Sequence, residues 1–152
     1  MMASILLFNK KGLANVRLQD IAEYNNISPG NLTYHFKTKK DLMEYIIYYM
    51  IRKLVEIENT QRESLKHMSL YKILRNNLIF LFNYRFFFRD ILEIINLVPN
   101  AKSVYKDVII INEKFTTEYI NISIKNGYMK KEAFDGQYRT FARNNWAIIS
   151  SS

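Results

Sequence analysis

The sequence predicts an all-α protein in which a compact module of three short helices precedes a bundle of longer ones. With only 4 Gly and 2 Pro in 152 residues, it lacks the turn residues that an all-β protein needs. Apolar residues recur at the three- and four-residue spacing of a helix face through most of the chain. Because 49% of the residues are hydrophobic, the chain can bury a core. We place the boundary between module and bundle after residue 45, which divides the chain into residues 1–45 and 46–152.

The first forty residues contain the three short helices. The first covers residues 3–11 and ends at Gly12, with two lysines in its last turn, where the helix dipole favours cations. The second covers residues 18–24 and the third residues 28–36. Their lengths match those of a small helical domain rather than of a bundle.

Longer amphipathic helices follow the module. Thr38 and Asp41 have the spacing of a capping box at the start of the first of them. We expect the first of these helices to begin at Thr38 and the next to follow a cap at Ser69. Another covers residues 85–97, a fourth ends at Gly127, and the last runs from about residue 134 into the final serines. One buried stripe is expected to hold Leu70, Leu74, Leu78, Leu81 and Phe82.

The second and third helices together predict a helix-turn-helix. Ile21 is the apolar anchor of the first of the pair, and Ala22 lies where the two helices cross. Asn26 occupies the turn, where a left-handed backbone is common and Asn is the best choice after Gly. Ile27 is then expected to fill the core. Ser28 is a favourable N-cap, followed by a proline at the first helical position.

The third helix divides into two faces at 100° per residue. Its inward residues are expected to be Pro29, Leu32 and Phe36. Its outward residues are Gly30, Asn31, Thr33 and Tyr34, with His35 on the flank and half turned toward the core. A small, polar outward face suits the major groove of DNA, which admits a helix and is read through hydrogen bonds to base edges.

Three lysines follow this helix directly. Lys37, Lys39 and Lys40 surround the start of the next helix, and we expect them to hold DNA phosphates beside the groove-reading helix. The whole predicted set of DNA contacts is Pro29, Gly30, Asn31, Thr33, Tyr34, His35, Lys37, Lys39 and Lys40.

These residues resemble a known family. The segments Phe8–Gly12, Asp20–Ala22 and Ser28–Phe36, followed by Lys39 and Leu42, are similar to the DNA-binding domain of TetR/AcrR-type bacterial transcriptional regulators. The resemblance implies an all-helical, homodimeric repressor that binds a palindromic double-stranded operator and is released by a small-molecule effector in the C-terminal helices. It also implies that the chain stops inside the first of two dimerising helices and lacks the last one. Arg17 stands where the family often has Ser or Thr as the helix cap.

The C-terminal helices carry one candidate ligand site. Tyr84, Phe87 and Phe88 could line an effector pocket, although a run of apolar residues at helical spacing is more often plain core. Arg89 and Asp90 are expected to form a structural ion pair rather than a ligand clamp. His67 is expected to be structural or exposed.

Charge and composition exclude several classes of protein function. The net charge is +8, but residues 1–68 hold 10 basic and 7 acidic side chains and residues 69–152 hold 12 and 7, so no basic tail exists. We expect no enzyme, no metal and no cofactor: there is no cysteine, the two histidines lack ligand spacing, and no glycine-rich phosphate loop is present. No segment has the length of a membrane span. The absence of cysteine suits a cytoplasmic protein.

Three other functions stay open. The main rival is a helical protein–protein interaction module with a vestigial helix-turn-helix. A DNA binder without any ligand is a second. A membrane-surface role is a third, weakened because acidic residues are interleaved with the lysines.

Overall fold

The computed structural model describes residues 1–64 and 70–150, and this part of the chain contains helices and no strand. The all-α prediction is therefore confirmed. The predicted cap at Ser69 and the predicted role of His67 lie outside the described residues. The helices are α1 Met2–Lys11, α2 Leu18–Tyr24, α3 Pro29–His35, α4 Lys39–Ser64, α5 Leu70–Asn83, α6 Arg85–Arg89, α7 Ile91–Leu97, α8 Ala101–Lys125 and α9 Gln137–Ser150.

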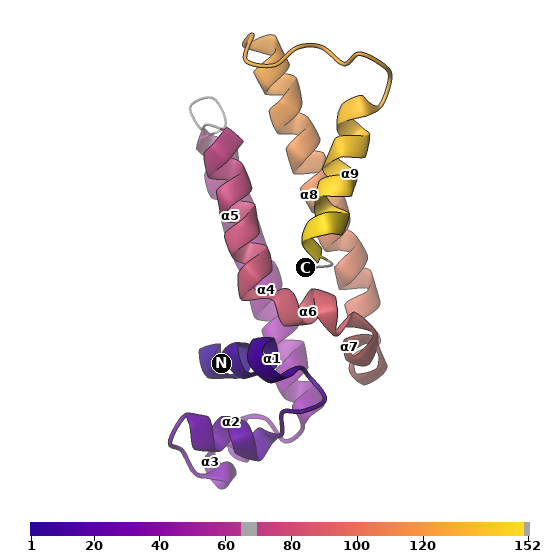
Figure 1. Cartoon of the computed structure of the whole chain (residues 1–152). Helices are drawn as coiled ribbons and strands as arrows, with labels where there is room; N and C mark the ends of the chain where they lie inside the picture. Colours follow the sequence, from indigo (N-terminus) through magenta and orange to yellow (C-terminus); the bar gives the residue numbers. More distant parts are fainter. Residues whose placement is uncertain (65–69, 151–152) are drawn as a thin grey trace.

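The molecule is elongated, with the three short N-terminal helices at one end (Figure 1). α4 runs from this end beside α5, and α8 pairs with α9 in a second helical hairpin. The short helices α6 and α7 cross the lower ends of these hairpins, next to α1. The helix-turn-helix thus occupies one tip of the molecule.

One apolar core connects the two parts of the chain. α4 buries Leu42, Ile46, Met50 and Leu54 along one face. Phe8 of α1 is fully buried against Phe86 of α6, with ring centroids 5.5 Å apart. The N-terminal module therefore shares its core with the longer helices instead of being tethered by a linker.

The helix predicted over residues 85–97 is wrong in one respect, because it is broken at Asp90. α6 ends and α7 begins at this residue, whose backbone has φ −101° and ψ 22°. The Asp90 carboxylate accepts hydrogen bonds from the Leu13 N–H and from the neighbouring Arg89 guanidinium. The bond from distant Leu13 and the bonds from neighbouring Arg89 together hold Asp90 at the junction of the two helices.

Two further predictions need correction. Leu78 and Phe82 are 47% and 66% exposed, so they do not belong to a buried stripe. Leu81 is buried as predicted, together with Phe80 of α5 and with Tyr84, which directly follows α5. The side chains of Leu70 and Leu74 lie outside the described residues. α9 begins at Gln137 rather than near residue 134, because Gly136 has a left-handed backbone with φ 77° immediately before it.

Candidate nucleic-acid interface

The α2–turn–α3 unit has the local structure that its sequence predicts. Ile21 and Ala22 are buried beneath α3. Asn26 has φ 53°, the one non-glycine residue with positive φ in the described chain. The Ile27 N–H donates to the Ala22 carbonyl at 3.0 Å, which closes the turn. The Ile27 side chain, however, is 37% exposed and does not fill the core, because the turn lies at the tip of the molecule with no further helix over it.

α3 begins at a well-formed cap. The Ser28 hydroxyl accepts a hydrogen bond from the Asn31 N–H at 3.1 Å, and Pro29 is the first helical residue. Leu32 is the buried residue of this helix, and Phe36 is half-buried at its end. Pro29 is exposed rather than inward, since a seven-residue helix that packs mainly on α2 can cover little more than one side chain.

The predicted outward face of α3 is free for a partner. The exposed residues are Gly30, Asn31, Thr33, Tyr34 and His35. Tyr34 is 83% exposed, and its ring meets the edge of the His35 ring at 5.2 Å. His35 is therefore exposed and not half turned to the core. The Thr33 hydroxyl donates to the backbone of its own helix, which leaves its oxygen as an acceptor.

The start of α4 shows the predicted reciprocal cap. The Thr38 N–H donates to the Asp41 carboxylate at 2.9 Å, and the Asp41 N–H donates to the Thr38 hydroxyl at 3.1 Å. Lys37 and Lys40 are exposed on either side, Lys40 lying 3.9 Å from Glu44. Lys39 differs from both: it is half-buried, and its ammonium donates to the Leu13 carbonyl.

A hollow of about 380 Å³ lies between α3 and the start of α2. We call it the α2–α3 hollow; its lining includes Val16, Arg17, Leu18, Gln19, Thr33 and Lys39. Arg17 is exposed, and its backbone N–H donates to the Asp20 carboxylate at 2.6 Å, so the side chain of Asp20 caps the start of α2. Sequence reasoning did not place Arg17 and Gln19 beside α3, although their position at the start of the helix-turn-helix was a usable signal.

A buried polar contact joins α1 to α6, and sequence reasoning missed its central residue. Asn9 is 5% exposed; its amide donates to the Asn83 carbonyl at 2.8 Å and accepts from the Phe86 N–H at 3.0 Å. The Arg89 guanidinium donates to the Phe8 and Asn9 carbonyls at 2.8 and 3.1 Å. Arg89 also pairs with Asp90 at 2.7 Å, which confirms the predicted structural ion pair. An asparagine inside the apolar stripe of α1 was the available clue.

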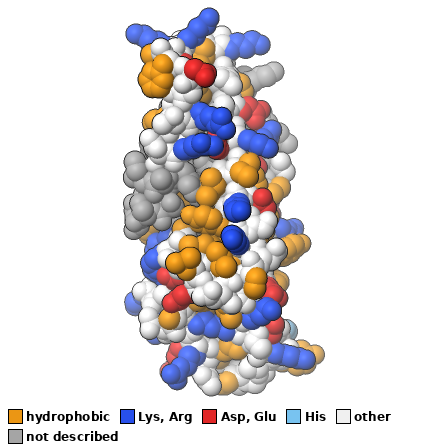
Figure 2. Space-filling model, turned by 90° about the vertical axis from the view of Figure 1, so that its right-hand side faces the viewer, with side chains coloured by type: hydrophobic (Ala, Val, Ile, Leu, Met, Phe, Trp, Pro, Cys, Tyr) orange, Lys and Arg blue, Asp and Glu red, His pale blue; other side chains and the backbone are white. Residues whose placement is uncertain are grey.

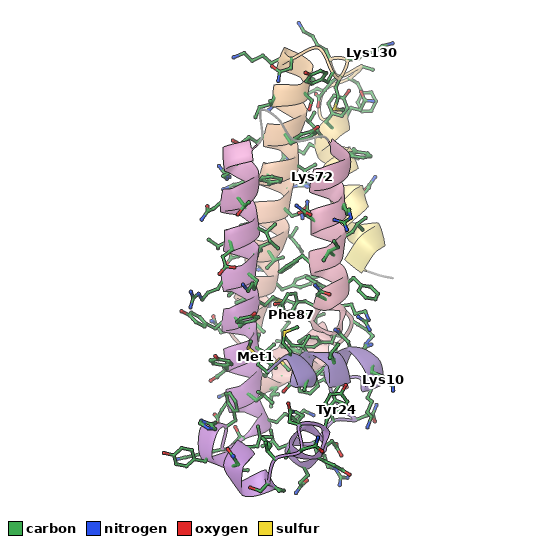
Figure 3. The ribbon with its side chains drawn as sticks, turned by 90° about the vertical axis from the view of Figure 1, so that its left-hand side faces the viewer. Met1, Lys10, Tyr24, Lys72, Phe87 and Lys130 are labelled. Atoms are coloured by element: carbon green, nitrogen blue, oxygen red, sulfur yellow. The ribbon has the colours of Figure 1, made fainter. Side chains whose placement is uncertain are left out.

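The predicted ligand residues Tyr84, Phe87 and Phe88 are buried in packed surroundings. Phe87 lies in the interior above α1 (Figure 3). Its ring meets those of Phe88 and Tyr105 at 5.4 and 6.4 Å, and Tyr84 packs on Phe80 at 4.9 Å. Burial raises the pKa of Tyr84 to about 12. The described contacts of these rings are those of a core, and their ligand role stays a prediction.

An apolar groove among the described C-terminal helices lies elsewhere. It measures about 350 Å³ and runs between α4 and α8, with walls that include Leu54, Val55, Val108 and Ile111. Asp107 and Lys114 stand at the same groove. An apolar hollow with few polar groups is the usual form of a small-molecule site.

Comparison with known proteins identifies the family. A family model described as "Bacterial regulatory proteins, tetR family" matches residues 2–46, and one described as "Bacterial transcriptional repressor" matches residues 49–152. The chain belongs to the TetR family. HTH-type transcriptional regulators of Staphylococcus aureus strains MRSA252 and USA300 are 28% identical over 102 residues, 66% of this chain and 53% of theirs. The chain thus spans about half the length of these curated relatives.

A solved structure agrees with the TetR-family assignment. A TetR-family transcriptional regulator from Marinobacter aquaeolei VT8 superposes with a TM-score of 0.76 at 25% identity, over 99% of this chain and 74% of that one. Within residues 1–64 and 70–150, no helix has both the length and the hydropathy of a membrane span. The same residues hold no cluster of three His, Cys, Asp or Glu side chains that could bind a metal.

Proposed function

We propose that this TetR-family chain is a sequence-specific DNA-binding repressor, not an enzyme, in which residues 1–45 bind DNA and residues 46–152 bind an effector and a second copy. α3 enters the major groove of double-stranded DNA. Asn31 and Thr33 contact base edges, while Lys37 and Lys40 contact phosphates. The observation that carries the proposal is the free polar face of α3, held at the tip of the molecule by a capped helix-turn-helix.

The distribution of charge supports a local interface. Figure 2 shows Lys and Arg side chains spread along the whole of one long face, with Asp and Glu among them. A surface of this kind offers no continuous basic track for nucleic acid. Specific recognition therefore depends on the small face of α3 and on the lysines next to it.

The repressor acts as a homodimer on a palindromic operator. Two copies of α3 would meet successive major grooves about 34 Å apart on one side of the duplex. An effector releases DNA by preferring a dimer with a different spacing. The groove between α4 and α8 supports an effector site in the C-terminal helices, since its size and apolar walls suit a small molecule. Light scattering that finds a monomer at micromolar concentration contradicts the dimer.

A binding selection tests the DNA contact. The protein is used to select duplexes from a random library. The most enriched duplex is then labelled and titrated with the protein, and binding is followed by fluorescence anisotropy. We expect saturable binding that Tyr34→Ala weakens at least tenfold, because Tyr34 is 83% exposed on α3.

The matched control is Tyr128→Ala. Tyr128 is 79% exposed in the loop between α8 and α9, at the opposite end of the molecule, so its removal should not change affinity. Equal losses in both variants, or no enriched sequence at low salt, would contradict the proposal and favour a protein–protein interaction module.

A further inference from the structure

Lys39 does not have the surroundings of a phosphate-binding lysine. It is the first residue of α4, directly beyond the recognition helix α3, yet it is half-buried where Lys37 and Lys40 are exposed. Its ammonium donates to the Leu13 carbonyl and lies 6.0 Å from the centre of the Phe8 ring. Burial lowers the pKa of Lys39, against the opposing effect of Glu93 and Asp20. The charge is thus already engaged inside the protein.

The backbone of Leu13 is bound on both sides. Its N–H donates to the Asp90 carboxylate at 2.8 Å, while its carbonyl accepts from Lys39. Asp90 in turn is held by the Arg89 guanidinium at 2.7 Å. Leu13 therefore connects Asp90, at the junction of α6 and α7, to Lys39, the first residue of α4. Because α3 ends shortly before Lys39, this connection also bears on the position of α3.

The α2–α3 hollow contains a second cation in a different state. Arg17 lines the same hollow as Lys39, but it is exposed, and no ion pair of its side chain is found among the described residues. A phosphate that approaches this side of α3 meets a free guanidinium at Arg17. To bind Lys39, the phosphate would have to displace the Leu13 carbonyl, which already accepts a hydrogen bond from the Lys39 ammonium.

We propose that Lys39 is a positioning residue for DNA binding: with Asp90 it fixes Leu13 and thereby the orientation of α3, while Arg17 is the cation of the hollow that contacts the DNA backbone. This inference rests on the DNA binding proposed above. In this proposal Lys39 does not contact a phosphate. It links the helices of the effector domain to the recognition helix.

The salt dependence of DNA binding separates the two roles. Each phosphate contact that is lost lowers the slope of log affinity against log salt by about 0.9. On the duplex selected by the wild-type protein, Arg17→Gln should reduce this slope by about 0.9. Lys39→Met retains the apolar stem and removes the ammonium; it should lower affinity about tenfold at every salt concentration and leave the slope unchanged. Lys130→Met, in the remote α8–α9 loop, controls for net charge and should change neither quantity.

The effect of Asp90 substitutions on DNA affinity is the second readout. Asp90 lies at the α6–α7 junction, away from α3 at the tip of the molecule, so its substitution removes no direct contact of α3 (Figure 1). Asp90→Ala should reproduce the loss of affinity without a change in slope. Asp90→Asn, which keeps an oxygen for the Leu13 N–H, should restore most of it. The double variant of Lys39→Met and Asp90→Ala should bind no more weakly than the worse single variant, since both remove one connection.

The outcomes are distinct. A slope that falls by about 0.9 in Lys39→Met, or losses that add in the double variant, would overturn the positioning role and make Lys39 a phosphate contact. Absence of DNA binding by the wild-type protein would overturn the proposed function itself. All titrations are made well below the thermal midpoint of each variant. Hydrogen exchange at the Leu13 amide, faster in Lys39→Met than in Lys130→Met, tests the connection without DNA.

Discussion

The contact between α1 and α6 should depend on a single buried amide. Asn9 is 5% exposed and makes two hydrogen bonds to backbone groups of the α5–α6 junction, the Asn83 carbonyl and the Phe86 N–H. Asn9→Ala removes both bonds and leaves the Phe86 N–H buried without its partner. The lost bond to the Asn83 carbonyl costs about 1 kcal/mol, and the Phe86 N–H left buried and unsatisfied costs about 1–3 kcal/mol. We expect the free energy of unfolding to fall by about 2–4 kcal/mol.

Urea unfolding followed by far-UV circular dichroism measures this loss. With a slope near 2 kcal/mol per molar urea, the midpoint should fall by about 1–2 M. Asn15→Ala is the matched control, because the exposed Asn15 amide donates to a single backbone carbonyl, that of Lys11, at 2.9 Å. Its effect should stay within about 0.5 kcal/mol. If Asn9→Ala costs no more than Asn15→Ala, Asn9 does not stabilise the contact and the reasoning fails.

Three further outcomes are expected. Ser4 is 1% exposed, and its hydroxyl has no hydrogen-bond partner among the described residues, so Ser4→Ala should raise the stability to urea by about 0–1 kcal/mol; a clear loss would contradict this. Asn26 has φ 53°, so Asn26→Ala should lower stability by about 1 kcal/mol, while Asn26→Gly should not; equal effects would show that backbone strain is irrelevant there. Burial alone would raise the pKa of Asp90, but hydrogen bonds from Arg89 and from the Leu13 N–H outweigh it and hold this pKa below its ordinary value of 3.8. The folded form is therefore favoured by the ionised carboxylate above pH 3.8, and this stabilisation is lost as the pH falls through the lower pKa of the folded state. Urea midpoints measured across the acid range should fall less steeply in Asp90→Asn than in the wild-type protein.

Features that depend on a few neighbouring residues could be predicted from the sequence. The cap at Ser28, the reciprocal cap of Thr38 and Asp41, and the left-handed turn at Asn26 are all confirmed. Each involves groups within three residues of one another, so local chemistry decides the geometry. The outward direction of Asn31 and Tyr34 follows from helix periodicity in the same way.

Features that depend on distant partners could not be predicted in this way. Periodicity predicted one helix over residues 85–97, whereas the chain has two helices that meet at Asp90, whose carboxylate accepts a hydrogen bond from the Leu13 N–H, 77 residues away in the chain. Pro29 and Ile27 were expected to be buried, but no other element within residues 1–64 and 70–150 covers this tip of the molecule. The environment of a side chain at the end of a short helix is set by what packs over it, and that is a property of the whole fold.

The sequence alone determined the all-helical class, the position of the helix-turn-helix and the polar face that it presents, because these depend on spacing and on local hydrogen bonds. Only the tertiary structure decided which of the three lysines that follow α3 are exposed. Lys37 and Lys40 reach solvent, while Lys39 meets the Leu13 carbonyl and the Phe8 ring. The number of lysines can be read from the sequence. Whether each ammonium is left to bind a phosphate depends on the hydrogen-bond acceptors that the fold places beside it.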